Sequence, residues 1–203
     1  MTKVFLSLIF VVSLNALVAQ DFAGYILYEY SYVDSTGQDI TERLAKEQGR
    51  EQHYYINGTD YVAFDEAGAL EQLYNSSSNQ YFFPYQGEMQ ALSGAVEFPA
   101  APNVILLEEQ TTILGYECKA LIFVMETGKT TYYYSDEVAI DPEPFKVHRF
   151  GNWATYLLQT KGALALKIVS EQEGYTRIME ATKIEQREMK EDLIDIHTYL
   201  DKN

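Results

Sequence analysis

The stretch from Thr111 to Asp136 constrains the fold of this chain most, because it has the pattern of two β-strands joined by a tight turn. We predict strands over Tyr116–Met125 and Thr130–Ser135, with Gly128 in the turn, since glycine tolerates the positive φ that tight hairpin turns require. Side chains alternate between the two faces of a strand. A turn over Glu126–Lys129 then predicts these opposite pairs: Met125 with Thr130, Phe123 with Tyr132, and Leu121 with Tyr134.

Both faces of this predicted hairpin are apolar from Ala120 onward, and only Glu117 and Lys119 interrupt the pattern near its start. An antiparallel sheet with one solvated face alternates apolar and polar residues instead. We therefore expect other strands, a helix or a ligand to cover both faces near the turn. Two interpretations stay open: an ordinary two-sided core, or a face that lines a cavity.

The first 19 residues have the pattern of a cleaved secretory signal peptide. Lys3 is followed by the apolar run Val4–Val12, and Ala16-Leu-Val-Ala19 resembles a cleavage site. The alternative is a membrane anchor, but the run is short for a spanning helix and contains Ser13 and Asn15. We predict a single domain over residues 20–203, located in the periplasm or outside the cell, with no transmembrane segment in the mature chain.

The composition favours a β-rich globular domain and excludes some partners. Aromatic residues make up 14% of the chain, and 17 of them are Tyr, which favours strands. The net charge of −15 argues against nucleic acid and against anionic membrane surfaces as partners. Cys118 is the single cysteine, so no intrachain disulfide can form, and we expect it to be buried.

The rest of the chain alternates strand and turn signals. The first strand, Gly24–Val33, places Ile26, Tyr28, Tyr30 and Tyr32 on one face. The other predicted strands are Arg50–Asn57, Thr59–Asp65, Ala69–Tyr74, Gln80–Tyr85, Val104–Glu109, Ala163–Glu173 and Tyr175–Glu185. Short helices are predicted over Asp39–Glu47, capped by Asp39 or Thr41, and over Phe150–Thr160, capped by Asn152. Glu188–Asn203 has the spacing of an amphipathic helix, and an extended tail on the barrel edge is the alternative.

No local motif in the sequence points to catalysis, a metal or a cofactor. His53, His148 and His197 are far apart, and no nucleophile, phosphate-loop or dinucleotide signature occurs. The acidic residues of Asp136–Pro144 fit no calcium-loop spacing and favour a solvated turn. We therefore expect no enzyme, no cofactor and no metal. A pocket that joins His148 to Asp141 and Glu143 would favour a hydrolase instead.

Four short motifs resemble exported Bacteroidetes proteins of unknown function, of the GLPGLI type and its relatives with the fold of the outer-membrane lipoprotein carrier LolA. They are Gly24-Tyr-Ile-Leu-Tyr-Glu29, Leu114–Ala120, Gly162–Leu166 and Glu180–Ile184. The GLPGLI motif itself is absent, and Lys161-Gly-Ala-Leu-Ala-Leu stands in its place. The resemblance implies an incompletely closed antiparallel barrel with helices near its concave side, and in the carrier that cavity accepts acyl chains.

These observations lead to one functional hypothesis and two rivals. We expect a mainly β protein, a curved antiparallel sheet with two or three short helices, that binds an apolar or acylated ligand such as a lipid or an acylated protein. The candidate ligand-cavity residues are Leu121, Phe123, Met125, Tyr132, Tyr134 and Trp153, because cavity walls are mostly apolar with a few polar tips. The rivals are a structural domain whose core is filled by its own side chains, and a hydrolase without a local motif.

Overall fold

The computed structural model describes residues 21–126, 128–190 and 193–200. The predicted signal peptide, residues 1–19, lies outside the described residues, and the single domain over 20–203 stays a prediction. Within the described part of the chain, no helix is long and apolar enough to cross a membrane.

One antiparallel sheet dominates the structure, and eleven strands form it in the order β6-β5-β4-β3-β2-β1-β11-β10-β9-β8-β7. The strands are β1 Gly24–Asp34, β2 Glu51–Ile56, β3 Tyr61–Asp65, β4 Leu70–Asn75, β5 Gln80–Tyr85, β6 Glu88–Ser93, β7 Asn103–Ile113, β8 Tyr116–Met125, β9 Gly128–Ala139, β10 Ala163–Gln172 and β11 Tyr175–Gln186. The helices are α1 Thr41–Gln48, α2 Trp153–Thr160 and α3 His197–Leu200, with single 3₁₀ turns at η1 Glu143–Phe145 and η2 Phe150–Asn152.

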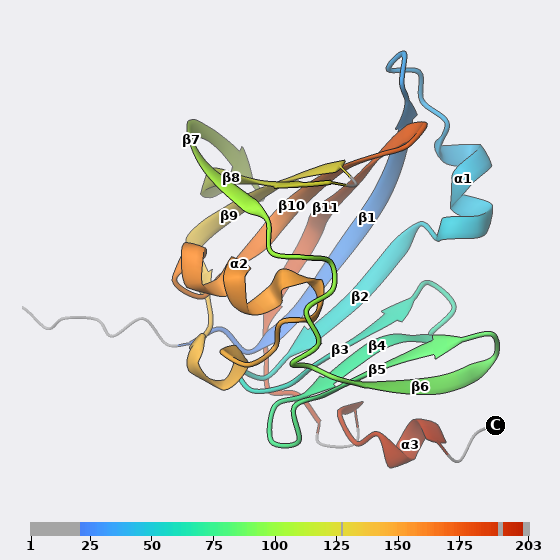
Figure 1. Ribbon diagram of the computed structural model, residues 1–203, viewed down its shortest axis with the longest axis vertical. Coiled ribbons are helices and arrows are strands. Elements are labelled where there is room, and N and C mark those ends of the chain that lie inside the picture. Colours follow the sequence, from blue (N-terminus) through green and yellow to red (C-terminus); the bar gives the residue numbers. More distant parts are fainter. Residues whose placement is uncertain (1–20, 127, 191–192, 201–203) are drawn as a thin grey trace, which may run out of the picture.

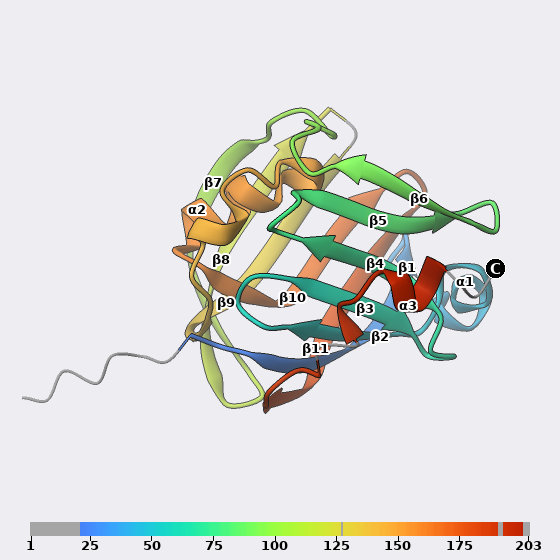
Figure 2. The ribbon, with the colours of Figure 1, turned by 90° about the horizontal axis from the view of Figure 1, so that it is seen from below.

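The sheet curves strongly but does not close. Strands β6 and β7 are the two ends of the strand order, so the described residues contain no ladder between them. Figures 1 and 2 show the connection from β6 to β7 and helix α2 lying across the open side of the curve. The predicted fold class, a curved antiparallel sheet forming an incompletely closed barrel with a few short helices, is confirmed.

Tyrosine and aliphatic side chains fill the concave side of the sheet. Ile26, Tyr28, Tyr30 and Tyr32 of β1 are all at most 8% exposed, as their predicted common face requires. Helix α2 adds Tyr156 and Leu157 to the same core. The short helices therefore complete a core that the curved sheet alone leaves open.

The convex side carries a second, smaller apolar cluster. Val62, Leu73 and Phe82 of neighbouring strands β3, β4 and β5 are buried there, and Met189, Leu193 and Ile196 pack against them. Most of the C-terminal segment described is irregular, and α3 spans only four residues. Among the described residues of Glu188–Asn203, the predicted amphipathic helix is reduced to α3, and turns precede it; these residues cover the convex cluster (Figure 1).

The predicted hairpin exists, but its register differs by two residues. The pairs are Met125 with Gly128, Phe123 with Thr130 and Leu121 with Tyr132. The predicted loop was too long, because Gly128 already belongs to β9, where an added Cβ would lie 2.4 Å from the carbonyl oxygen of Glu171 on β10. A shift of two residues leaves each side chain on its predicted face, since the strand period is two.

The expectation that both faces of the hairpin are covered near the turn is wrong for the convex face. Leu121 and Phe123 are 0% and 1% exposed, but Val124 is 38% exposed. Cys118 is buried, as expected, and burial raises the pKa of its thiol. The curve of the sheet explains the difference, because its concave face holds the core whereas the end of β8 and β9 projects into solvent on the other side.

One strand and one helix cap differ from what the sequence predicted. Strand β6 was not predicted; it follows β5 through Gln86 and Gly87, which both have positive φ. The N-cap of α1 is Ile40 rather than the predicted Asp39 or Thr41. The predicted N-cap position of α2, Asn152, is confirmed, but its side chain makes no capping bond.

Candidate functional site

The concave face of the sheet contains a pocket of about 480 Å³ that reaches from β1 and β2 to β9 and β10. Its wall includes Trp153, the first residue of α2, and Gly151 just before it. Trp153 therefore approaches the pocket from the opposite side to the strands. Pockets of roughly 300–1,000 Å³ are typical small-molecule sites.

Aromatic rings form a large part of this pocket's wall. The rings belong to Tyr28, Tyr30, Tyr54, Tyr132 and Trp153. Tyr28 and Tyr54 meet edge to face at 6.3 Å between ring centroids. Behind the wall, Tyr156 supports Tyr132 at 4.8 Å and Trp153 at 5.8 Å. The rings are thus held in place by a second layer of aromatic packing.

A β-bulge turns a carboxylate into the same pocket. In the ladder between β3 and β4, Ala63 pairs with Gln72 and Phe64 pairs with Leu70, so Glu71 is the extra residue. Glu71 and Gln72 consequently both line the pocket, although neighbours in a regular strand face opposite sides. Gln52 of β2 donates a hydrogen bond from its amide Nε2 to Glu71 Oε2 at 2.7 Å. Burial raises the pKa of Glu71, against the lowering effect of this hydrogen bond.

A positive charge lies in the same wall. The guanidinium carbon of Arg177, on β11, is 5.6 Å from the ring centroid of Tyr30. Its charge also acts to lower the pKa of Glu71, but no ion pair joins the two side chains among the contacts of the described residues. The pocket thus presents one acidic and one basic group, together with amides and hydroxyls.

Two buried donors at the pocket have no hydrogen-bond partner within the described residues: the hydroxyl of Tyr54 and the Nε1–H of Trp153. Tyr54 is only 6% exposed, and burial raises its pKa well above 10, so the hydroxyl keeps its proton at neutral pH. The neighbouring Tyr28 differs, because its hydroxyl donates to the carbonyl oxygen of Ala165 at 2.7 Å. Buried polar groups without partners are uncommon and require an explanation.

A second, smaller hollow of about 170 Å³ continues the pocket toward β5. The two share Tyr54, Gln72, Gly151 and Trp153, and the smaller one is closed by Tyr61, Tyr81 and Phe150. Tyr54 and Trp153, the two residues with unpartnered donors, therefore border both hollows.

The structure divides the six predicted cavity residues into two groups. Tyr132 and Trp153 line the concave pocket. Leu121, Phe123 and Tyr134 are buried in the core and are not among the residues of its wall, and Met125 borders a shallow depression near the hairpin turn. A ligand contact of any of the six stays a prediction. The sequence analysis did not select Glu71, Gln52 or Arg177. Glu71 enters the wall through a bulge, which nothing local in the sequence marks.

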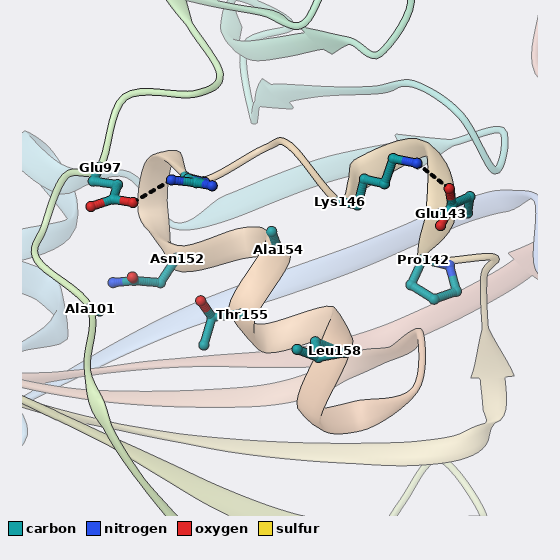
Figure 3. Close-up of a pocket in the computed structure, with 10 residues that line it drawn as sticks. Glu97, Ala101, Pro142, Glu143, Lys146, Asn152, Ala154, Thr155 and Leu158 are labelled. Atoms are coloured by element: carbon teal, nitrogen blue, oxygen red, sulfur yellow. Dashed lines mark hydrogen bonds and ion pairs between the residues drawn. The ribbon is translucent and has the colours of Figure 1, made fainter.

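A second depression of about 470 Å³ lies on the outer side of α2 (Figure 3). Two ion pairs border it: Arg149 with Glu97 at 2.6 Å, and Lys146 with Glu143. All four charged side chains are more than half exposed, and Leu158 is 73% exposed. No aromatic ring and no residue with a partnerless buried donor lines this depression within the described part of the chain, whereas the concave pocket has both, so the concave pocket is the stronger candidate.

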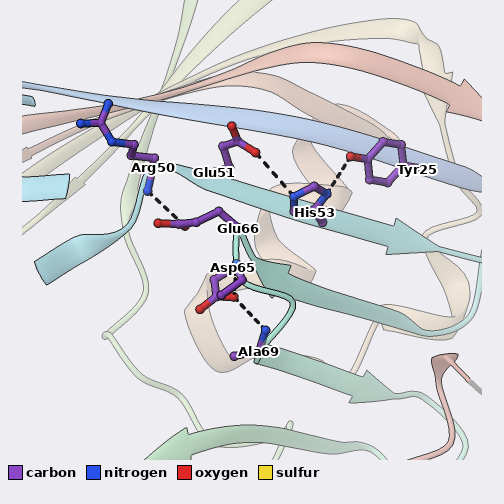
Figure 4. A network of polar contacts seen from close by, with 8 residues as sticks. Tyr25, Arg50, Glu51, His53, Asp65, Glu66 and Ala69 are labelled. Carbon is purple, nitrogen blue, oxygen red and sulfur yellow. Dashed lines mark hydrogen bonds and ion pairs between the residues drawn. The ribbon is translucent and has the colours of Figure 1, made fainter. Parts of the chain in front are cut away.

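Figure 4 shows a polar chain on the strands near the N-terminus, in which His53 lies between a hydroxyl and a carboxylate. His53 Nδ1 is 2.8 Å from the hydroxyl of Tyr25, and His53 Nε2 is 3.5 Å from Glu51 Oε2. Burial raises the pKa of Tyr25, which disfavours its use as a nucleophile. The guanidinium carbon of Arg187 lies 4.7 Å from the ring centroid of Tyr25, so these polar contacts surround an aromatic ring that is itself buried.

His148 does not join Asp141 and Glu143. Its Nε2 is 2.7 Å from the hydroxyl of Tyr61, and its ring stacks on Tyr74 at 3.9 Å between centroids. Burial lowers the pKa of His148 to about 3, so the ring is neutral at ordinary pH. Within the described residues, no group of three or more His, Cys, Asp or Glu side chains is arranged to hold a metal ion.

Comparisons with solved structures show similarity in the fold. A structure of PNGF-II aligns with a TM-score of 0.51 at 16% identity, over 85% of this chain and 30% of that chain. This chain therefore spans about 30% of the length of the PNGF-II chain. A LolA superfamily protein from Nitrosomonas europaea aligns with a TM-score of 0.35 at 8% identity, over 86% of this chain and 90% of that one. Lipoprotein LppX of Mycobacterium tuberculosis aligns with a TM-score of 0.34 at 6% identity, over 83% and 89%.

No family model matches this sequence, and no curated protein matches it. At 16% identity, the likeness to PNGF-II concerns the fold alone.

Proposed function

We propose that this chain is an exported, non-enzymatic binding protein that holds a ligand with a substantial apolar part, such as a lipid or an acylated protein, on the concave face of its sheet. The observation that carries the proposal is the concave pocket of about 480 Å³ between the strands and the start of α2. The described core is otherwise closely filled, with Leu121, Phe123 and Tyr156 at most 2% exposed. A space kept open beside such a core is the expected form of a ligand site.

The aromatic wall supports an apolar contact with the ligand. Tyr28, Tyr54, Tyr132 and Trp153 present ring faces and edges to the pocket, and the second aromatic layer behind them restricts their movement. Rigid aromatic walls bind with little loss of side-chain entropy. The ligand's apolar surface would therefore lie against these rings.

Binding without chemistry fits the character of the pocket's polar groups. A general base needs a substrate proton within reach and a pKa near the working pH. Glu71 is the one carboxylate in the wall and hydrogen-bonds an amide rather than a nucleophile. Cys118 is buried elsewhere in the core, where burial raises the pKa of its thiol and makes it a poor nucleophile.

A pair of adjacent variants on β10 tests the proposal. Ser170 lines the pocket, whereas Val169 points to the opposite face because side chains alternate. Ser170→Trp should fill the pocket and reduce the affinity for a fluorescent fatty-acid probe at least tenfold, and Val169→Trp should leave it unchanged. Protein purified from its own host should carry a ligand detectable by native mass spectrometry. Ligand-free protein that also ignores the fatty-acid probe would contradict the proposal.

A second candidate is a structural domain with a self-filled interior. Four of the six predicted cavity residues are not in the pocket wall, and three of these four, Leu121, Phe123 and Tyr134, are core residues, which favours this reading for the β8–β9 half of the sheet. Unaltered protein that neither carries a ligand nor binds the probe would favour it for the whole molecule.

A further inference from the structure

We propose that the polar wall of the concave pocket recognises an uncharged saccharide ring, either as a free sugar or as the head of a glycolipid. This inference rests on the proposed function, because the same pocket would hold the ligand's apolar part. It adds the chemistry of the polar part, which is carried by Gln52, Glu71, Arg177, Tyr54 and Trp153.

The first argument is that the wall is built around a carboxylate. The bulge in β4 brings Glu71 into the pocket beside Gln72, and Gln52 occupies one of the two carboxylate oxygens at 2.7 Å. A hydrocarbon chain laid against Glu71 would remove water from the carboxylate without replacing its hydrogen bonds, which is unfavourable. A ligand that covers this wall therefore needs hydrogen-bond donors.

The second argument is the balance of charge. Arg177 lies 5.6 Å from the Tyr30 ring centroid in the wall that also contains Glu71. A cation attracted to Glu71 and the rings would be repelled by Arg177, and an anion attracted to Arg177 would be repelled by Glu71. A hydroxyl group both donates and accepts hydrogen bonds, so a polyhydroxylated, uncharged ligand satisfies both side chains.

The third argument is the pair of unpartnered donors. Tyr54 and Trp153 both line the pocket, and the Tyr54 hydroxyl and the Trp153 Nε1–H are buried with no partner among the residues that the structure describes. Sugar hydroxyl and ring oxygens are acceptors of the kind they lack. The C–H face of a sugar ring is apolar and packs on aromatic rings, which the same two side chains supply. One ligand class thus matches the rings, the amides, the two charges and the orphan donors together.

A panel of probes distinguishes this inference from the proposed function. We would titrate the full protein with methyl β-glucopyranoside, methyl β-galactopyranoside and methyl α-mannopyranoside, with octyl β-glucopyranoside below its micellar concentration, and with octanoic acid and phosphocholine. Calorimetry or saturation-transfer NMR gives the readout. At least one glycoside should bind, and Glu71→Gln should weaken that binding about tenfold or more, because hydrogen bonds to a charged group are the stronger kind.

The matched control is Glu29→Gln, which makes the same change of charge on β1. Glu29 is exposed and lies between Tyr28 and Tyr30, which face the pocket, so it points the other way. Its affinity for the glycoside should equal that of the unaltered protein. Equal weakening by both variants would overturn the assignment to the polar wall, since it would reflect net charge alone.

The other outcomes are also decisive. Tighter binding of octyl glucoside than of methyl glucoside points to a glycolipid, and equal binding to a free sugar. Octanoic acid binding with no glycoside binding overturns the saccharide inference but leaves the proposed function intact. Phosphocholine binding alone overturns it in favour of a zwitterionic head. Failure of all the probes overturns both.

Discussion

Replacing Tyr54 by phenylalanine removes a single oxygen atom from the wall of the concave pocket. That hydroxyl is buried and has no hydrogen-bond partner within the described residues. The cost of burying such a group is about 1–3 kcal/mol. Tyr54→Phe should therefore raise the free energy of unfolding by about that amount. For a chain of this size, each kcal/mol raises Tm by roughly 2–4 °C. The same change should weaken ligand binding, because it removes a donor.

The matched control is Tyr28→Phe. Tyr28 packs against Tyr54 and is almost equally buried, at 5% against 6% exposed, but its hydroxyl donates to the carbonyl oxygen of Ala165 at 2.7 Å. Its loss leaves that buried carbonyl without this donor, so Tyr28→Phe should lower the free energy of unfolding by about 1–3 kcal/mol.

Urea unfolding of the ligand-free protein, followed by tryptophan fluorescence, measures both variants on one scale. The two substitutions should change stability in opposite directions. If Tyr54→Phe destabilises the protein as much as Tyr28→Phe does, the Tyr54 hydroxyl has a partner in the folded state, and its use as an open ligand donor is refuted.

Three further predictions address the core, the pH response and the C-terminal cover. Phe123→Ala should lower the free energy of unfolding by about 3–5 kcal/mol, because Phe123 is 1% exposed. A loss below about 1 kcal/mol in urea unfolding would contradict its place in the core. Burial lowers the pKa of His148 to about 3, below its ordinary value near 6.5, so the unfolded chain takes up a proton first on acidification and stability falls from pH 6.5 downward. Between pH 7 and pH 5, His148 should lower the free energy of unfolding by about 2 kcal/mol. Urea titrations of His148→Phe should lack that part of the loss. Deleting residues 188–203 should expose the cluster of Val62, Leu73 and Phe82, which increased binding of a dye for apolar surfaces would report; unchanged dye binding would show that the segment is not a cover.

Local patterns were sufficient to predict much of the sheet. The alternation in Gly24–Val33 placed Ile26 and Tyr32 on a buried face, and both are 0% exposed. Turn residues such as Gly58 and Gly174, both with positive φ, marked the ends of strands correctly. These features depend on neighbours one to four residues apart, so they are readable in a linear sequence.

The register of the central hairpin and the composition of the pocket were not predictable in this way. Both depend on contacts between distant segments: Gly128 is required by the carbonyl of Glu171, and Trp153 meets Tyr54 through the curve of the whole sheet. Of the predicted cavity residues, Tyr132 and Trp153 reached the pocket, whereas Leu121 and Phe123 filled the core beside it. An apolar side chain has the same pattern in the sequence whether it fills the core or lines a cavity.

Glu71 shows most clearly which part of the pocket could not be predicted from the sequence. Strict alternation from Leu73 assigns Glu71 to the convex face, and one unpaired residue in the ladder between β3 and β4 turns it into the pocket. The alternation of side chains is a property of a single strand, so the face of each residue in a regular strand can be predicted from the sequence. A bulge arises from how two strands pair and how far the sheet must bend, so the polar chemistry of the pocket emerged only once all the strands were assembled.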